Sequence, residues 1–439
     1  MTLIDLTRPP VFSSRLGSLP VAIIGAGPIG LAAAANLVER GIDFVIYEVG
    51  DSIADSMRQW GHIRLFSPWK HLVDPASRRL LEAAGWTHPD MDGLPTGAEM
   101  VDQYLIPLAE LEPIASRIRT AVEVVGVARE GMDRTRTSNR LTTPFLLRVR
   151  EGAEISESTA RAVIDASGTY RSPNSLASTG LEPLGLPEVA DLVSHALPDV
   201  LGGERVRFAG RHTTVVGAGH SAANTLLNLA ALAEQEPATR ITWVIRNASA
   251  VRVSTSDDDE LAARASIGAR VDALVASGAI EVLDQFEIVR LARIGDTVRI
   301  VGSRAGELVD HETDLVVNAT GFRPDLGILR EVRLELDDIV EAPKRLAPLI
   351  DPNIHSCGTV EPHGFAELQQ PENGFFLAGM KSYGRAPTFL LATGYEQVRS
   401  ITAWLAGDMA AATKVELTLP ATGVCSTSAA GPEASSCCS

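Results

Sequence analysis

Three glycines near the N-terminus have the spacing that lets a backbone hold a diphosphate. They lie in Gly25–Gly30, a segment that reads Gly-Ala-Gly-Pro-Ile-Gly and follows the apolar run at 21–24. Gly25 permits a tight turn, Gly27 lets the backbone approach the phosphates, and Gly30 lets the next helix pack on the strand. With Pro28 completing the loop, the anion would lie at a helix N-terminus, where free N–H groups and the dipole favour it.

An acidic residue stands at the position where this kind of loop needs one. Glu48 ends the next predicted strand, 43–48, and follows the first glycine of the motif along the chain. A carboxylate there accepts hydrogen bonds from ribose hydroxyls and repels a 2′-phosphate. The sequence therefore predicts a dinucleotide site without a 2′-phosphate. The alternative is a glycine-rich turn of an α/β protein that binds nothing.

A second glycine motif occurs far along the chain. Gly217, Gly219 and Ser221 lie in the run Gly-Ala-Gly-His-Ser-Ala, after the apolar strand predicted at 213–216. The strand that follows, 241–246, ends in Arg246 rather than in an acid. A guanidinium there suits the 2′-phosphate of NADP, so the motif predicts NADPH as the second ligand. The alternative for Arg246 is a solvated arginine at a strand end.

The elements that position these loops repeat one pattern. A strand at 21–24, a helix at 31–40 and a strand at 43–48 form one βαβ unit, and the segments 213–216, 221–233 and 241–246 form another. Further strands are predicted between 123 and 150 and at 162–165, 298–301 and 315–317, and an amphipathic helix at 388–405. We expect an α/β fold with two Rossmann-like dinucleotide-binding domains.

Size and charge agree with this expectation. A chain of 439 residues is long for one hydrophobic core. Its formal charge of −16 opposes binding to nucleic acid or to anionic membranes. Four cysteines, none before Cys357, exclude a disulfide scaffold, and no His or Cys spacing predicts a metal site. Residues 1–20 lack the order of a signal peptide, so we expect a cytoplasmic protein without a membrane span.

Together with the segment Asn318–Pro324, the two motifs resemble the two-dinucleotide-binding-domain flavoproteins. That resemblance implies FAD at the first motif and NADPH at the second, with Thr320 and Gly321 in the return segment and Gly379 near the flavin. It also implies an FAD domain at 18–205 and 325–408, an inserted NADPH domain at 206–324 and a flexible tail at 409–439. A homodimer is compatible with it.

More narrowly, Gly61–Trp69 and Lys381–Phe389 resemble the flavin-dependent monooxygenases encoded beside bacterial arsenic-resistance genes. Such an enzyme uses O2 and a flavin hydroperoxide to oxygenate a soft nucleophile, here a small molecule such as a trivalent arsenical. By this resemblance Trp60 and Trp69 lie along the flavin ring. Thr388 begins the helix that faces the ring, and Lys381 and Arg385 bind the flavin or an oxyanion product. The alternative is that both tryptophans are core residues and that Arg385 is a surface residue.

The tail leaves three interpretations open. Cys425, Cys437 and Cys438 offer thiolates, the ligands expected for As(III), so the tail is a candidate for capturing an arsenical substrate. The second interpretation is a reductase that relays electrons through Cys437 and Cys438, although no dithiol occurs near the predicted flavin site. The third is a non-enzymatic, metalloid-binding flavoprotein. Thiols without any role in a disordered tail remain the simplest alternative.

Overall fold

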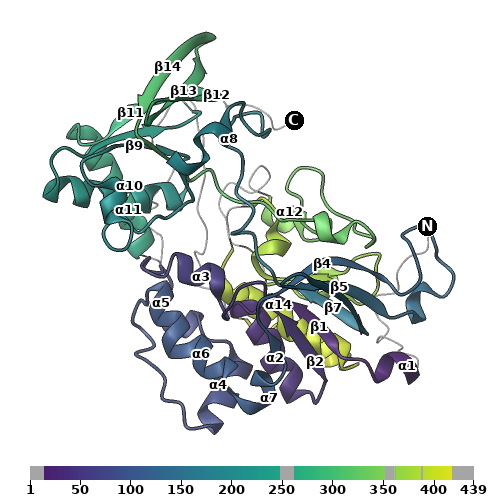
Figure 1. Ribbon diagram of the computed structural model, residues 1–439. Coiled ribbons are helices and arrows are strands. Elements are labelled where there is room, and N and C mark those ends of the chain that lie inside the picture. Colours follow the sequence, from purple (N-terminus) through teal and green to yellow (C-terminus); the bar gives the residue numbers. More distant parts are fainter. Residues whose placement is uncertain (1–13, 248–261, 352–359, 361, 387–388, 418–439) are drawn as a thin grey trace, which may run out of the picture. The chain divides into compact units, whose positions relative to one another are not determined.

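The computed structural model describes residues 14–247, 262–351, 360, 362–386 and 389–417. These residues form two compact units (Figure 1). Unit 1 contains 14–172, 323–351 and the described part of 360–417, and unit 2 contains the described part of 173–322. The chain of unit 2 is therefore inserted within the chain of unit 1.

The start of the insertion differs from the expected residue 206. Unit 2 begins at Pro173, because strand β8 (Val193–Ser194) pairs with β15 (Leu315–Asn318) and so belongs to the sheet of the inserted unit. A two-residue strand has too little periodicity to be recognised from its sequence.

Unit 1 is built around a parallel sheet that contains both strands of the first predicted βαβ unit. Its order is β16-β7-β1-β2-β3, and Val21 lies opposite Phe44 on one side and Ala162 on the other. Strands β1 and β7 are buried at every residue, as expected for parallel strands that are covered on both faces. The strands are β1 (Val21–Ile24), β2 (Phe44–Tyr47), β3 (Ile118–Arg119), β7 (Ala162–Asp165) and β16 (Phe375–Leu377).

Three helices of unit 1 pack together beside this sheet. Helix α2 (Pro28–Glu39) contacts both α14 (Leu391–Leu405) and α4 (Pro75–Ala83) (Figure 1). The run Ala32–Ala35 on α2 is fully buried, and its small side chains permit close approach of neighbouring elements. Helix α2 begins at Pro28, where proline loses no helical hydrogen bond.

A three-stranded antiparallel sheet, β4-β5-β6, completes the regular part of unit 1, and shorter elements connect the rest. The strands are β4 (Val122–Arg129), β5 (Phe145–Glu151) and β6 (Glu154–Ala160). The short helices are α1 (Ser14–Gly17), α3 (Asp55–Gln59), α5 (Gly97–Met100), α6 (Ile106–Ala109), α7 (Glu112–Ala115), α12 (Ala347–Ile350), α13 (Phe365–Leu368) and α15 (Met409–Thr413). The other helical turns are η1 (Trp69–His71), η2 (Val101–Leu105), η3 (Arg140–Thr142), η5 (Gly327–Leu329) and η6 (Gly379–Tyr383).

Unit 2 repeats the plan with its own parallel sheet, in the order β11-β10-β9-β15-β8, and an antiparallel sheet β12-β13-β14. Its strands are β9 (His212–Val216), β10 (Arg240–Val244), β11 (Glu281–Leu283), β12 (Phe286–Ile294), β13 (Thr297–Arg304) and β14 (Glu307–Thr313), besides β8 and β15. Its helical elements are α8 (Leu186–Val189), η4 (Ala190–Leu192), α9 (Arg205–Phe208), α10 (His220–Gln235) and α11 (Ala262–Ala276). The predicted α/β class is confirmed. Within the described residues, no helix combines the length and apolarity that crossing a bilayer requires.

Candidate functional site

The first glycine loop needs glycine for two separate reasons. Gly25 adopts a φ of +98°, and a Cβ built on it would lie 2.8 Å from the carbonyl oxygen of Ala166. A Cβ on Gly30 would lie 1.9 Å from the carbonyl oxygen of Gly25, so a side chain there would push α2 away from the turn. A side chain at either position would collide with the protein's own backbone, so the fold of the loop itself requires both glycines.

Gly27 faces open space instead. A Cβ built there would meet no atom within 4 Å, although its neighbours in the loop are crowded. Gly27 is the N-cap of α2, no side chain caps the helix, and Pro28 follows as its first residue. The first N–H groups of a helix have no partner within the helix. An anion such as a diphosphate therefore fits the open side of this loop.

Glu48 lies beside the loop, almost entirely buried. Its Oε2 accepts a hydrogen bond from the Ala26 N–H at 2.8 Å, and its Oε1 accepts one from the Gly50 N–H at 2.9 Å. Burial raises the pKa of this carboxyl, and the two backbone donors oppose that rise. Each oxygen keeps a lone pair for a further donor. Two ribose hydroxyls would fit that remaining capacity.

Lys381 forms an ion pair rather than facing open space. Its Nζ lies 2.7 Å from Oδ2 of Asp165 and 3.0 Å from Oγ of Ser167, and both charged side chains are at most 1% exposed. The Ser167 hydroxyl in turn donates to Oδ1 of Asp165 at 2.6 Å. The ammonium is thus held at the carboxyl end of β7, and the expectation that Lys381 binds the flavin or an oxyanion product stays a prediction. The ammonium braces the segment whose backbone meets Gly25.

Gly379 closes the loop from another side. Its φ is +67°, and a Cβ on it would lie 2.9 Å from Cγ1 of Ile29. Its N–H donates to Oε1 of Gln397 at 2.8 Å, and Gln397 is fully buried on α14. Sequence reasoning found Gly379 and missed Gln397, because a glutamine inside an amphipathic helix carries no local signal.

The other residues expected at the flavin lie on separate elements of unit 1. Trp69 is buried in η1, and Trp60 is half-buried with its ring against Gly97, where a Cβ would lie 2.9 Å from Cζ3 of Trp60. Arg385 is exposed, and its N–H donates to Val340 O at 2.7 Å. No contact in the described residues joins Trp60, Trp69 and Arg385 into one cluster.

Helix α14 of unit 1 does not include the residues just before Leu391, although the sequence predicted a helix that begins at Thr388. Helix α14 begins at Leu391 with Leu390 as its N-cap, and Thr388 lies outside the described residues. Pro387 and Thr388 precede the helix in a segment whose apolar pattern extends the helical periodicity, which explains the error.

The second glycine loop, in unit 2, has the same geometry as the first. Gly217 adopts a φ of +129°, and a Cβ there would lie 2.1 Å from the carbonyl oxygen of Ala319. The indole N–H of Trp243 donates to Gly217 O at 2.6 Å. Gly219 caps α10 without a side-chain partner and faces open space, with Ser221 in the first turn. This loop is therefore a second candidate phosphate site.

Arg246 lies just beyond the end of β10 and is exposed. This is the position at which the sequence predicted a guanidinium for a 2′-phosphate, on the strand next to β9. Its side chain is accessible to a ligand, and no ion pair occupies it within the described residues.

Thr320 and Gly321 are held by Asn174, which sequence reasoning missed. The Thr320 hydroxyl donates to Asn174 O at 3.0 Å, and Nδ2 of Asn174 donates to Thr320 O at 3.2 Å. The N–H of Asn174 donates to Gly321 O at 2.9 Å, and Gly321 adopts a φ of +95°. The return segment of unit 2 is thus fixed to the start of the same unit, more than a hundred residues away in sequence.

The candidate As(III) ligands Cys425, Cys437 and Cys438 lie outside the described residues, as does Cys357. Among the described residues, no group of three or more His, Cys, Asp or Glu side chains could hold a metal ion.

Comparisons with known proteins agree with the two-unit geometry. The bacillithiol disulfide reductase Bdr from Bacillus cereus superposes with a TM-score of 0.65 at 19% identity, over 88% of this chain and 98% of that one. A Kutzneria ornithine N-hydroxylase with reduced FAD, NADP+ and L-ornithine gives 0.58 at 17% identity, over 89% and 99%. A flavin monooxygenase mutant from Stenotrophomonas maltophilia gives 0.56 at 24% identity, over 88% and 98%. No curated protein matches the sequence.

At these identities the solved structures show the fold alone, and the family comes from the sequence. The model of the family described as "Pyridine nucleotide-disulphide oxidoreductase" matches residues 22–356, which include both glycine loops and the return segment. The prediction of an oxidoreductase with two Rossmann-like regions is confirmed, and FAD and NADPH agree with it. The chain belongs to the pyridine nucleotide-disulphide oxidoreductase family.

Proposed function

We propose that this chain is an FAD-dependent monooxygenase that consumes NADPH and oxygenates a soft nucleophile, with a trivalent arsenical as the candidate substrate. The observation that carries the proposal is the open phosphate cradle at Gly25–Gly30, in a sequence without any cysteine before Cys357. A disulfide reductase needs a dithiol in contact with the flavin, so the oxygen chemistry of the monooxygenases that share this fold suits the chain better than disulfide chemistry.

The residues of unit 1 divide the work of holding FAD. The backbone at Gly27 and the first turn of α2 bind the diphosphate, and Glu48 accepts hydrogen bonds from the ribose. Lys381 acts through Asp165 and Ser167, which keep the segment beside Gly25 in place. FAD held by these residues would supply the transfer of two electrons from NADPH to O2, so that one oxygen atom would go to the substrate and the other would leave as water.

In unit 2, the backbone at Gly219 and the first turn of α10 bind the diphosphate of NADPH. Arg246 pairs with the 2′-phosphate, as a planar guanidinium does well. Asn174 keeps Thr320 and Gly321 in place at the neighbouring strand end.

The soft substrate is suggested by the tail. Cys425, Cys437 and Cys438 would bind As(III) as thiolates and present it for oxygenation. No triad or side-chain nucleophile is required for such a reaction, because the reactivity comes from the flavin.

A second candidate, an electron-relaying reductase, is favoured by the similarity in fold to a bacillithiol disulfide reductase and by the adjacent Cys437 and Cys438. The two candidates differ in their need for oxygen. A reductase reduces a disulfide anaerobically at the expense of NADPH, whereas a monooxygenase consumes O2 and NADPH in step with its substrate.

The test is to measure NADPH oxidation and O2 uptake by the FAD-loaded enzyme with trivalent arsenicals, sulfides and amines. A monooxygenase gives substrate-stimulated consumption of both with an oxygenated product. Anaerobic disulfide reduction without any O2-dependent product would establish the reductase instead. Replacing Cys425, Cys437 and Cys438 by serine should raise KM for the arsenical and leave FAD bound. Unchanged kinetics would exclude the tail from substrate capture.

A further inference from the structure

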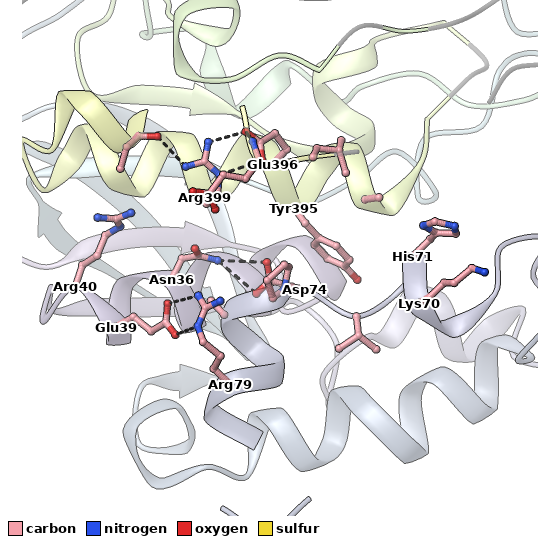
Figure 2. A pocket seen from close by; sticks show the side chains of 17 residues that line it. Asn36, Glu39, Arg40, Lys70, His71, Asp74, Arg79, Tyr395, Glu396 and Arg399 are labelled. Atoms are coloured by element: carbon pink, nitrogen blue, oxygen red, sulfur yellow. Dashed lines mark hydrogen bonds and ion pairs between the residues drawn. The ribbon is translucent and has the colours of Figure 1, made fainter. Parts of the chain in front are cut away.

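Unit 1 contains a pocket of about 230 Å³ between helices α2, α4 and α14 (Figure 2). Asn36, Asp74 and Tyr395 contribute its most deeply buried polar groups, and charged side chains surround them. On α14 the lining residues include Tyr395 and Arg399, whereas Gly394 and Gln397 contact Ile29 and Gly379. The pocket therefore lies on a different face of α14 from the nucleotide loop.

Asp74 is the distinctive residue of this pocket. It is 1% exposed and caps α4, and its Oδ2 accepts hydrogen bonds from the N–H and hydroxyl of Ser77 at 2.7 and 2.9 Å. Its Oδ1 has only a long contact, 3.4 Å, with Nδ2 of Asn36. Burial raises the pKa of Asp74 to about 6, so the group is mainly ionised at neutral pH.

The described residues provide Asp74 with no ion-pair partner, a feature that it shares with Glu48 and that distinguishes both from the buried carboxylates Asp165 and Glu372. Asp165 has Lys381 at 2.7 Å. Glu372 has Arg129 at 2.8 Å and Arg140 at 2.7 Å. Because burying a charge is costly unless it is paired, an ionised carboxylate beside a cavity indicates a cation that comes from outside.

The cations around the pocket are already engaged. Arg79 makes two contacts of 2.7 Å with Glu39, and Arg399 makes contacts of 2.6 and 3.0 Å with Glu396 (Figure 2). Arg40 lies 3.5 Å from Asp408. The charge of Arg79 lowers the pKa of Asp74, against the larger effect of burial, but the guanidinium pairs with Glu39 and forms no direct ion pair with Asp74.

The hydrogen-bonding capacity that remains in the pocket is that of an acceptor. The Tyr395 hydroxyl donates to Leu72 O at 2.7 Å and also interacts with the Tyr104 hydroxyl, so it has oxygen lone-pair capacity but no free proton for a ligand. The amide nitrogen of Asn36 donates to Ala32 O at 2.9 Å. A ligand rich in N–H donors suits such a set of groups.

Two other sources of positive charge fit less well. A metal ion would need several ligands, and the described residues contain no group of three or more His, Cys, Asp or Glu suited to one. The C-terminal segment 418–439, which follows pocket residue Leu417 in the chain, contains no lysine, arginine or histidine.

We propose that this pocket binds a small organic ammonium ion, whose N–H groups donate to the carboxylate of Asp74 and to the hydroxyl oxygen of Tyr395. The site is separate from the nucleotide loops, and the proposal does not depend on the proposed monooxygenase activity.

The test is calorimetric titration of the full-length, FAD-loaded protein with n-propylamine at pH 8, with n-propanol and sodium propionate as neutral and anionic probes of the same size. We expect saturable binding of the amine alone. Asp74→Asn keeps a side chain that caps α4 equally well, so the fold is retained. It should weaken amine binding at least about tenfold, since a charge-assisted hydrogen bond is lost.

A second arm varies the pH. The charged and titratable side chains around Asp74 belong to several elements, and the list includes Glu39, Arg40, Lys70, His71, Arg79, Tyr104, Tyr395, Glu396, Arg399 and Glu416. Proton uptake by a carboxylate or by a histidine makes the pocket less attractive to a cation. Amine binding should therefore decline in the wild type between pH 8 and pH 5. Absence of saturable binding at pH 8 would overturn the proposal, as would equal binding by the Asp74→Asn variant or equal binding of propanol.

Discussion

The ion pair of Lys381 and Asp165 joins two residues that sequence analysis treated separately. Asp165 ended the strand predicted at 162–165, and Lys381 was expected to bind the flavin or an oxyanion product. The structure joins their side chains at 2.7 Å, with almost no solvent exposure. The charge state and position of each of these two side chains therefore depend on a buried partner from a distant part of the sequence.

Lys381→Met should destabilise unit 1 by about 3–5 kcal/mol, because it leaves the Asp165 carboxylate buried and unpaired. The double variant with Asp165→Asn should recover most of this loss, because neither charge remains. Urea unfolding of the apoprotein measures both effects. If Lys381 contacted only a ligand, the single variant would bind FAD more weakly and unfold like the wild type.

Arg246→Ala should lower kcat/KM for NADPH about 10- to 100-fold, as loss of a charge-assisted pair of about 1.5–3 kcal/mol implies. The value for NADH should hardly change, because NADH lacks the 2′-phosphate. Steady-state kinetics with both coenzymes provide the comparison. An equal loss for both would assign Arg246 a general role in the sheet edge.

At the scale of elements, each nucleotide loop combines at least one crowded glycine with one open glycine. Gly25 must stay small because of its φ and because of Ala166, whereas Gly27 has free space beside it. Substitution of Gly25 should therefore affect folding, whereas substitution of Gly27 should affect only ligand binding.

Gly25→Ala should cost about 1–3 kcal/mol of stability, as expected for a side chain at strained positive φ, and should also reduce FAD content. Gly27→Ala should leave the unfolding of the apoprotein unchanged while its methyl group impedes the diphosphate. Thermal unfolding without FAD and fluorescence titration with FAD distinguish these effects. Tight FAD binding by Gly27→Ala would show that the diphosphate lies elsewhere.

Elements with strong local signals were predictable. The strands at Val21–Ile24 and Ala162–Asp165 have the predicted bounds, because their apolar runs end abruptly at glycine or polar loops. The pocket around Asp74 was not predictable, since α2, α4 and α14 contribute single residues from distant parts of the sequence. Lys381 and Asp165, 216 residues apart, pair only once the chain has folded.

At the scale of the whole molecule, the two units should respond to acid differently. In unit 2, His311 Nε2 lies 2.8 Å from Oγ1 of Thr214, and its ring meets His212 edge-on at 5.4 Å. Burial, and then the neighbouring His212, lowers the pKa of His311 to about 4. In unit 1, burial raises the pKa of Asp74 to about 6. The two shifts have opposite consequences for stability.

Unit 2 should lose stability as the pH falls from about 6.5 to about 4, because in this range His311 is protonated in the unfolded chain and remains mostly neutral in the folded one. His311→Gln should flatten this dependence by about 1–2 kcal/mol, after allowance for the ring's partial exposure. The contribution of Asp74 runs the other way, since folded unit 1 binds the extra proton between about pH 6 and 4. Scanning calorimetry at pH 7.5 and 5 detects both; identical slopes for wild type and His311→Gln would refute the histidine account.

The isolated antiparallel bridge between Pro173 and Phe322 brings both ends of the inserted unit together. Because the two ends of unit 2 lie next to each other, unit 2 can be removed or exchanged without a long connection between the two parts of the unit 1 chain. Replacing 174–321 by a short glycine-serine linker should therefore leave a folded unit 1 that binds FAD and is no longer reduced by NADPH. A homologous segment grafted at the same two points would then dictate which reductant the hybrid accepts.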